Sequence, residues 1–170
     1  MNRYTVISAA AVAVIVAPFL YSGISILGAH ELEYRWAQPG RFSFFDLSNH
    51  GDVELCNPLP FWTSFEALKI DAYYDSAHHG TFTVGPASLD PLAHATKGGV
   101  FRSDGLAASQ HIFMTLDYEF DGGVLRLDPN RFVIVSSIET PILGFIPYTT
   151  SEKISGFDFD QMMNSLSLSC

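Results

Sequence analysis

The chain has 170 residues, of which 48% are hydrophobic, 14% aromatic and 16% charged. Fourteen phenylalanines and seven tyrosines are too many aromatic side chains for a disordered segment, so the composition indicates a folded protein. The formal net charge of −9 argues against a phosphate-rich partner such as a nucleic acid or an anionic lipid surface.

The first 29 residues predict a membrane anchor. Arg3 is the only charged residue before Glu31, and the stretch between them is almost wholly apolar. A helix needs roughly 20 apolar residues to cross a bilayer core of about 30 Å, and this stretch supplies them. Basic residues stay on the cytoplasmic side of a membrane. We therefore expect a single span with the N-terminus in the cytoplasm and the C-terminal domain outside it.

Two alternatives to an anchor stay open, a cleaved secretory signal and a buried helix of a soluble protein. A secretory signal has an apolar core of about 7–15 residues and a small-x-small cleavage site. The run here is longer, and Ile-Leu-Gly-Ala before His30 matches Ala-x-Ala poorly. Pro18 interrupts the run, but membrane helices tolerate proline better than soluble helices do. We expect an anchor at residues 1–29, a linker at 30–40 and one domain at 41–170.

The domain after the anchor carries all 18 acidic residues and eight of the nine basic ones, a formal charge of −10. Its apolar residues recur at every second position in short runs that are separated by turn residues, a pattern typical of an all-β antiparallel sandwich. We expect strands at residues 41–47, 53–56, 68–74, 81–84, 111–120, 131–136 and 142–146. Residues 85–105, rich in Gly, Pro and Ala, are expected to wrap an edge, and residues 157–164 to form a short C-terminal helix.

Cys56 and Cys170 are the only cysteines. In an oxidising compartment a pair of cysteines tends to be bonded, and this bond would join the last residue to an early strand. The alternative is a buried Cys56 and a free Cys170 at a frayed end. Mass spectrometry with and without reductant distinguishes the two arrangements.

A turn motif, Asn57-Pro58-Leu-Pro60-Phe61, follows the strand predicted at 53–56. The two prolines cannot donate hydrogen bonds to a β ladder. Asn57 can hydrogen-bond the neighbouring backbone where the strand ends, and Phe61 can fold back over the core. We interpret these four residues as a structural motif.

Residues 53–61 resemble the strand and Asn-Pro turn of the LEA14-type, or WHy (water stress and hypersensitive response), domain. Residues 68–74 with the turn to Gly80 resemble its second strand and hairpin, and residues 140–147 resemble its closing strand. The resemblance covers residues 41–150 and departs from the family pattern in a longer stretch at 85–107. It implies a fibronectin-III-like β-sandwich with at most one helix, no established catalytic residues, and a role in stress or desiccation tolerance.

The chain as a whole is also similar to small membrane-anchored proteins of ammonia-oxidising archaea. The shared strings are Phe-Ser-Phe-Phe-Asp-Leu-Ser, which begins at Phe42, and Thr-Pro-Ile-x-Gly-x-Ile-Pro-Tyr, which begins at Thr140. This likeness indicates lineage and not chemistry.

Six histidines raise the question of a metal site. His78 and His79 are adjacent, so only a turn could aim both at one ion. His111 is predicted to lie opposite the apolar face of its strand. Neither the ligand pairs of a zinc site nor the ligand loop of a blue-copper site occurs.

Other chemical motifs are also missing from the sequence. Asp158 and Asp160 are spaced like half of a Ca²⁺ loop that lacks its glycine and glutamate, and Met162 and Met163 in an apolar tail are typical of packing. There is no Gly-x-Ser-x-Gly nucleophile elbow. We therefore expect no catalytic residue, no cofactor and no metal.

These observations favour a non-catalytic, membrane-anchored β-sandwich protein with a structural, stress-protective or protein-interaction role. Its expected partners are the membrane, through one span, and another envelope or membrane protein, but no nucleic acid. The alternative is an accessory single-span subunit of a larger membrane-bound enzyme complex, with small residues at 8–13 and 22–23 that let helices approach closely. A third hypothesis, a metal carrier, predicts stoichiometric Cu or Zn in the purified domain.

Overall fold

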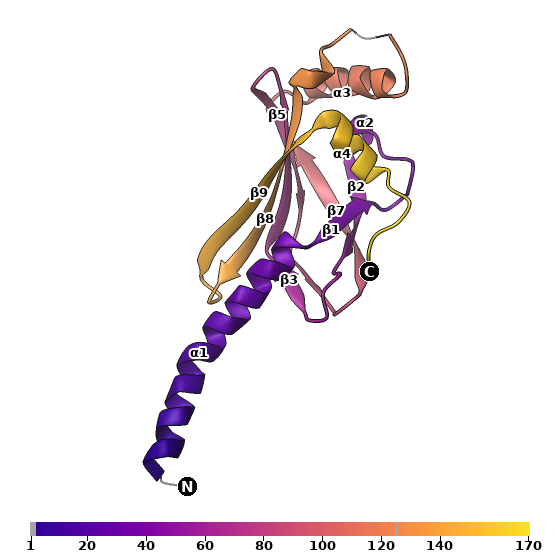
Figure 1. Cartoon of the computed structure of the whole chain (residues 1–170). Coiled ribbons are helices and arrows are strands. Elements are labelled where there is room, and N and C mark those ends of the chain that lie inside the picture. Colours follow the sequence, from indigo (N-terminus) through magenta and orange to yellow (C-terminus); the bar gives the residue numbers. More distant parts are fainter. Residues whose placement is uncertain (1–2, 125) are drawn as a thin grey trace.

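The computed structural model describes residues 3–124 and 126–170. One long helix leaves one end of a β domain, and shorter helices cover the opposite end (Figure 1). The helices are α1 (Arg3–His30), α2 (Phe44–Leu47), α3 (Leu106–Phe120) and α4 (Gly156–Met163), with a 3₁₀ turn at Pro129–Arg131.

The domain contains one large and one small antiparallel sheet. The large sheet has the strand order β1-β2-β7-β5-β4-β8-β9, and the small sheet pairs β3 with β6. The predicted mainly antiparallel β fold is therefore confirmed, whereas the fibronectin-III-like sandwich stays a prediction. The strands are β1 (Glu33–Trp36), β2 (His50–Cys56), β3 (Thr63–Phe65), β4 (Ala67–Tyr74), β5 (Ala77–Val84), β6 (Ala87–Leu89), β7 (His94–Arg102), β8 (Phe132–Ile142) and β9 (Ile146–Ser155).

The core lies between the large sheet and the short helices. Alternation along β4 buries Leu68, Ile70 and Ala72 on one face, as the period-two pattern predicts. Phe44 of α2 is fully buried, and its ring packs edge-on against Phe132 of β8, with centroids 4.8 Å apart. Such edge-to-face pairs add stability beyond the area they bury, so the end of the domain away from α1 has an aromatic core.

Several predicted elements are present. Strands β2, β4 and β5 contain the runs predicted at 53–56, 68–74 and 81–84, and β8 contains all but the first residue of the run predicted at 131–136. Helix α4 is the predicted C-terminal helix. Four residues of the predicted linker, Glu33–Trp36, form the edge strand β1, which pairs with β2.

The strand predicted at 111–120 is wrong, because these residues belong to helix α3. The alternation of Ile112, Met114 and Leu116 is short enough to fit either period. The residues that α3 buries follow helical spacing, and they include Ser109, Phe113 and Leu116. The strands before and after it in the sequence, β7 and β8, already have two neighbours each in the sheet. The segment therefore covers the sheet with its apolar face as a helix.

The strand predicted at 41–47 is also wrong, since Phe44–Leu47 form the one-turn helix α2. Ser43 caps this turn by accepting a hydrogen bond from the Asp46 amide at 3.0 Å, a typical N-cap interaction. Asp117 accepts hydrogen bonds from the amides of Phe44 and Phe45 at 2.7 and 2.9 Å. The turn therefore depends on a side chain 72 to 73 residues away along the chain, which a local pattern cannot reveal.

The expectation that residues 85–105 wrap an edge is wrong as well. Strand β7 lies inside the large sheet, between β2 and β5. Its Gly99 leaves no room for a Cβ because the ring of Phe82 packs directly against it. The glycine that suggested a loop instead permits a close approach within the sheet.

The separate strand predicted at 142–146 is wrong, because these residues form the end of β8, the turn after it and the start of β9. Strand β8 runs through Pro141 to Ile142, and the chain turns only at residues 143–145 before β9. Pro141 lies opposite Pro147 at the end of the hairpin. Two prolines facing each other need no ladder donors, so the ladder continues past them.

Candidate functional site

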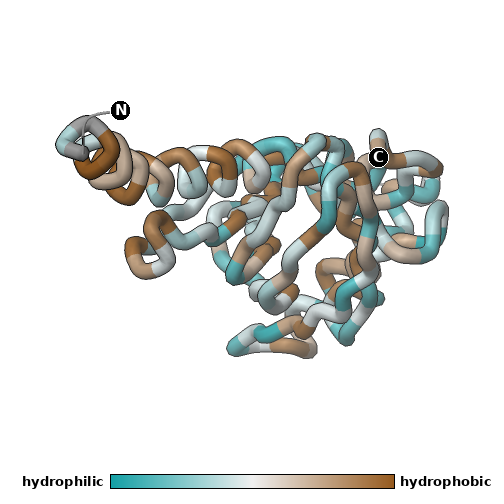
Figure 2. The backbone as a smooth tube through the Cα atoms, turned by 90° about the horizontal axis from the view of Figure 1, so that it is seen from below, coloured by the Kyte–Doolittle hydropathy of each residue, from teal (hydrophilic) through white to brown (hydrophobic). Residues whose placement is uncertain are grey.

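The first part of helix α1 exposes its side chains to the surroundings. Every side chain from residue 6 to residue 21 is exposed, as is Tyr4. The helix segment Val6–His30 has a mean hydropathy of 2.2 and is long and apolar enough to cross a membrane. Figure 2 shows this apolar helix projecting beyond the domain. Exposed apolar residues all around a helix suit lipid and not water.

The second part of α1 packs on the β domain. Ser22, Ser25, Gly28 and Ala29 are buried, and their spacing places them on one helix face against β3 and β8. Because these side chains are small, the helix comes close to the strands. Gly28 lies so near Thr63 that no Cβ would fit. The small face predicted for a partner helix is therefore used, from Ser22 onward, by this chain's own strands.

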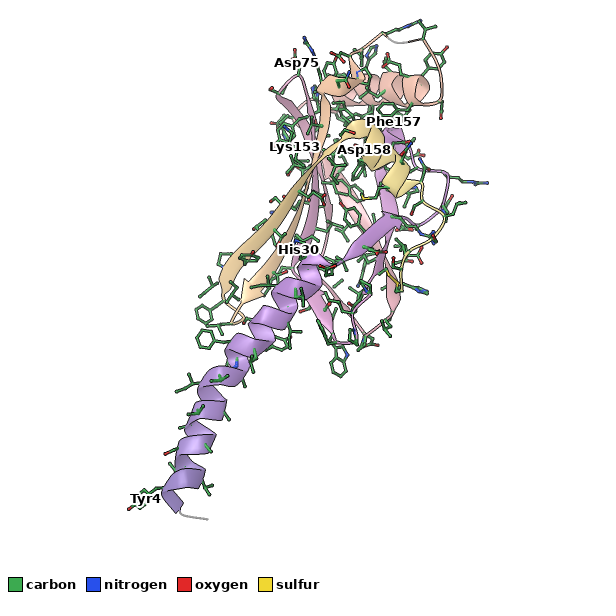
Figure 3. The ribbon with its side chains drawn as sticks, in the orientation of Figure 1. Tyr4, His30, Asp75, Lys153, Phe157 and Asp158 are labelled. Atoms are coloured by element: carbon green, nitrogen blue, oxygen red, sulfur yellow. A yellow bond between two sulfur atoms is a disulfide. The ribbon has the colours of Figure 1, made fainter. Side chains whose placement is uncertain are left out.

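A hydrogen bond at Ser22 joins the helix to the β8–β9 turn. The Leu143 amide donates to Ser22 Oγ at 2.9 Å, and the same hydroxyl donates to the Pro18 carbonyl at 2.9 Å. Figure 3 shows His30 where α1 meets the domain and Tyr4 at the far end of the helix. Helix α1 and the β domain are therefore joined over about two turns of helix and not by a loose linker.

The Asn57 turn lies at this same end of the domain. Asn57 is fully buried, and its amide donates to the carbonyls of Phe61 at 2.7 Å and Asp90 at 2.9 Å. Its side-chain oxygen accepts from the Leu59 amide at 3.2 Å and from Thr63 Oγ1 at 3.1 Å. Asn57 thus joins the β2–β3 connection, strand β3 and the β6–β7 connection. Its hydrogen-bonding capacity is used within the protein.

The rest of the predicted motif surrounds this asparagine. Pro58 and Phe61 are half-buried and Pro60 is exposed. Phe61 is not among the residues of the main core, so it covers the turn more than the core.

Cys56 and Cys170 form a disulfide in the structure, with Cα atoms 5.9 Å apart. Cys56 is the last residue of β2 and is buried. The tail also crosses β1, where Arg35 donates to the Ser165 carbonyl at 3.1 Å and Glu33 accepts from the Ser169 amide at 2.7 Å. These contacts hold the last residues beside the edge of the large sheet.

The histidines do not gather in one place. His78 Nε2 lies 3.4 Å from Asp71 Oδ1 and 3.2 Å from Thr81 Oγ1, and burial together with the neighbouring His78 lowers the pKa of His79. His111 is exposed on α3. Within residues 3–124 and 126–170, no group of three His, Cys, Asp or Glu side chains could hold a metal ion.

The acidic and sulfur residues of the tail have structural contacts. Asp158 accepts from Ser155 Oγ at 2.6 Å, and Ser155 caps helix α4. Burial raises the pKa of Asp160. Met163 is fully buried in the core, and Met162 packs against it in part.

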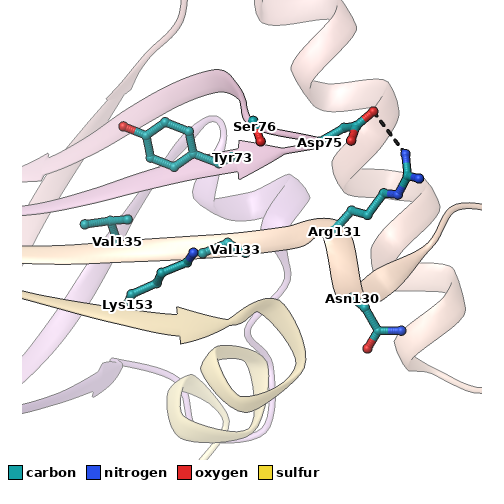
Figure 4. Close-up of a pocket in the computed structure, with 8 residues that line it drawn as sticks. All are labelled: Tyr73, Asp75, Ser76, Asn130, Arg131, Val133, Val135 and Lys153. Carbon is teal, nitrogen blue, oxygen red and sulfur yellow. Dashed lines mark ion pairs between the residues drawn. The ribbon is translucent and has the colours of Figure 1, made fainter.

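An open cleft of about 430 Å³ lies on the outer face of the sheet (Figure 4), and Figure 3 shows its residues Asp75 and Lys153 on the side of the domain away from α1. Arg131 at its edge pairs with Asp75 at 3.1 Å. Lys153 on β9 lies in the same cleft, so it presents a cation beside apolar side chains. Its lining residues, which include no histidine or cysteine, are Tyr73, Asp75, Ser76, Asn130, Arg131, Val133, Val135 and Lys153.

Asp117 on α3 is a second carboxyl group whose pKa is raised. Burial raises the pKa of Asp117 to about 6, although its bonds to the amides of Phe44 and Phe45 lower it. The charges of Asp160 and Asp121 raise it further. Perturbed carboxyl groups often mark active sites, but both oxygens of Asp117 are used to hold α2.

No protein-family model and no curated protein matches the sequence. A solved structure described as "Crystal structure of protein from Archaeoglobus fulgidus" is similar over 73% of this chain and 94% of that chain, with 7% sequence identity and a TM-score of 0.30. A likeness this weak carries no argument about fold or function.

Proposed function

We propose that this protein is a single-span membrane protein that holds a non-catalytic β domain outside the cytoplasm. Its role is structural, stress-protective or one of protein interaction. The division of α1 carries the proposal: residues 6–21 expose apolar side chains on every side, while the following turns pack on β3 and β8. A helix of this kind serves as a membrane span at one end and as part of a folded domain at the other.

The packing of α1 favours an uncleaved anchor over a cleaved signal. Ala29 is 1% exposed and belongs to the main core, together with Leu32. Cleavage after Ala29 would remove the residues that cover β3 and β8 and would expose Thr63, which is fully buried. Exposing buried surface costs free energy in proportion to its area.

Charge and cysteine chemistry support an extracytoplasmic domain. Arg3 is the only charged residue before Glu31, which favours a cytoplasmic N-terminus. The Cys56–Cys170 disulfide suits an oxidising compartment. The WHy resemblance of residues 53–61 supports a stress-protective role and is the basis for proposing a fibronectin-III-like sandwich.

Two truncations test the anchor. A chain that begins at Ser22 keeps the packed helix turns and is expected to be soluble and folded. A chain that begins at Glu31 loses them and is expected to unfold at a lower temperature. The intact chain should float with vesicles after alkaline extraction, and protease added outside intact cells should reach its domain. Equal stability of the two truncations, together with release of the intact chain by alkali, would contradict the proposal.

An accessory subunit of a larger membrane-bound enzyme complex is the second candidate. Residues 8–13, Ser-Ala-Ala-Ala-Val-Ala, are exposed and small and leave room for a neighbouring helix. Extraction in a mild detergent followed by native gel electrophoresis separates the two proposals. Migration with a large complex supports the subunit, and migration as a single small species supports the independent protein.

A further inference from the structure

At the end of the β domain from which α1 leaves, the loops contain a single charged residue, Asp90. The β2–β3 connection, the β6–β7 connection and the β8–β9 turn all lie at this end (Figure 1). Residues 57–65 and residues 140–151 contain no Asp, Glu, Lys or Arg, although the domain as a whole has 26 such residues. We call residues 57–62, 90–93 and 143–148 the membrane-proximal loops.

These loops expose large apolar side chains. The exposed fraction is 75% for Phe145, 67% for Trp62 and 60% for Leu92, and Ile146 and Tyr148 are also exposed. Exposed apolar residues that stand singly need no explanation, but a group of them on one surface indicates a binding site.

Backbone strain at two of the loop positions supports this interpretation. Leu92 and Leu143 both have a φ of 54°, a conformation that glycine or asparagine adopts at lower cost. Strained conformations persist where the surrounding structure and the function require them. Leucine at these two turns supplies an apolar side chain that glycine would not.

The position of the loops along α1 identifies what they contact. The free part of the helix, which precedes the packed turns, spans residues 4–21 and extends about 27 Å at 1.5 Å per residue, slightly less than the roughly 30 Å of a bilayer core. The Leu143 amide binds Ser22 Oγ, the first residue after this free part. The β8–β9 turn therefore lies where the hydrocarbon region ends.

The β2–β3 and β6–β7 connections lie on the other side of α1 from the β8–β9 turn (Figure 1). Trp62 precedes Thr63, which packs against Gly28, and its indole nitrogen donates to Asp90 at 2.9 Å. Tryptophan and tyrosine are enriched where a membrane meets water, because their rings are apolar and their polar atoms can still hydrogen-bond.

The charged residues nearest the loops indicate which lipid headgroups can lie beside them. Glu66 and Glu139 line a small groove beside Phe145, and Lys69 forms an ion pair with Glu139. Asp90 lies beside Trp62. With acidic groups on both sides and a domain charge of −10, contact with anionic headgroups is unfavourable, whereas neutral headgroups carry no such cost.

We propose that the membrane-proximal loops lie in the outer interface of the bilayer that α1 spans. They hold the β domain against neutral lipid, with its other end pointing away from the membrane. The inference rests on the proposed membrane anchor and adds that lipid covers this face of the domain. The cleft with Lys153, at the opposite end, then faces the aqueous space.

The two tryptophans of the chain allow a direct test in the full-length protein. Trp36 is buried in the core and Trp62 is exposed. The protein is reconstituted into phosphatidylcholine vesicles that contain lipids brominated at different depths of the acyl chain. We expect Trp62 fluorescence to be quenched by bromines near the headgroup and to be shielded from aqueous acrylamide. The Trp62→Phe variant reports the contribution of Trp36 alone.

A double variant tests whether the apolar loops cause this placement. Leu92→Asp with Phe145→Asp is expected to abolish lipid quenching of Trp62 and to restore acrylamide quenching. Leu106→Asp with Val124→Asp changes two exposed apolar residues away from these loops, and it should behave like the parent protein. Circular dichroism of each variant confirms that the fold is kept.

The outcomes separate this inference from the proposed function. If the chain floats with the vesicles but acrylamide quenches Trp62 fully, the anchor holds and the placement of the loops is wrong. If the chain does not float, the anchor itself is wrong. Equal quenching in the loop variant and the parent would also overturn the inference, because the apolar side chains would then have no part in it.

Discussion

The two ends of the β domain differ in what their aromatic and apolar residues do. At the end covered by α2, α3 and α4, the rings of Phe44, Phe113 and Phe132 are fully buried and pack against one another. At the end beside α1, Trp62 and Phe145 are exposed on turns. The first end uses aromatic residues for stability, and the second presents them to the surroundings.

The contacts beside α1 also differ in kind, and they hold the domain to the helix without a flexible linker. The end beside α1 is held by hydrogen bonds and close backbone contacts, as at Asn57, Ser22 and Gly28. Such contacts fix geometry without using the exposed apolar side chains, which stay free for an outside surface. Burial at the opposite end supplies the main part of the stability.

The largest expected effect is that of Phe44→Ala. Removing the ring leaves a cavity among Phe42, Phe113 and Phe132, and such changes cost about 3–5 kcal/mol of unfolding free energy. Phe145→Ala removes an equal ring from an exposed turn and should change stability by less than about 0.5 kcal/mol. Denaturant unfolding in detergent measures both. Similar losses in the two variants would remove the distinction between the ends.

Asn57→Ala tests whether a polar residue stabilises the end beside α1. The variant leaves the carbonyls of Phe61 and Asp90 and the amide of Leu59 without their partner, at a cost of about 2–4 kcal/mol. Asn130→Ala, at an exposed position, is the matched control and should be nearly neutral. A neutral Asn57 variant would mean that the turn keeps its shape without this amide.

Loss of the disulfide is expected to have a similar or smaller effect. Cys170→Ser opens a loop that closes over 114 residues, and loss of such a link typically costs about 2–4 kcal/mol. Thermal unfolding of Cys170→Ser is compared with that of Ser169→Ala. A mass difference of two hydrogens on reduction is expected for the parent chain, and two free thiols would contradict the bond.

The raised pKa of Asp117, at the end away from α1, makes the free energy of unfolding depend on pH. Its pKa is raised to about 6 in the folded protein, so the folded state binds a proton that the unfolded chain has lost above pH 4. The stability it contributes is complete below about pH 4 and is lost as the pH rises to about 6, by up to roughly 3 kcal/mol.

The Asp117→Asn variant isolates this contribution, because asparagine does not titrate. The difference in unfolding free energy between parent and variant should change between pH 4 and pH 6 and stay constant from pH 7 to pH 8. A difference that does not vary with pH would show that Asp117 titrates normally.

Gly28→Ala and Gly23→Ala form a matched pair in α1. Both changes raise helix propensity, but a Cβ at Gly28 overlaps Thr63, whereas one at Gly23 meets nothing. Overpacking typically costs about 1–3 kcal/mol, so Gly28→Ala should lower the unfolding temperature and Gly23→Ala should not. Equal temperatures would mean that α1 does not pack closely on β3.

Much of the fold follows from local pattern. Period-two alternation located β2, β4, β5 and β8, and the tail helix α4 was also predicted. The pattern failed at α3, where ten residues fit both periods, and at α2, which needs the distant carboxylate of Asp117. It failed again at β7, where Gly99 lies in a strand and leaves room for the ring of Phe82.

The sequence by itself determined the apolar span, the charge of the domain and the identity of the turn residues, because these depend on composition and on neighbours along the chain. Only the tertiary structure decided that α1 is divided at Ser22 and that the loops around Trp62, Leu92 and Phe145 lie together beside it. Those residues come from three separate connections, and only the pairing of distant strands brings them to one end of the domain.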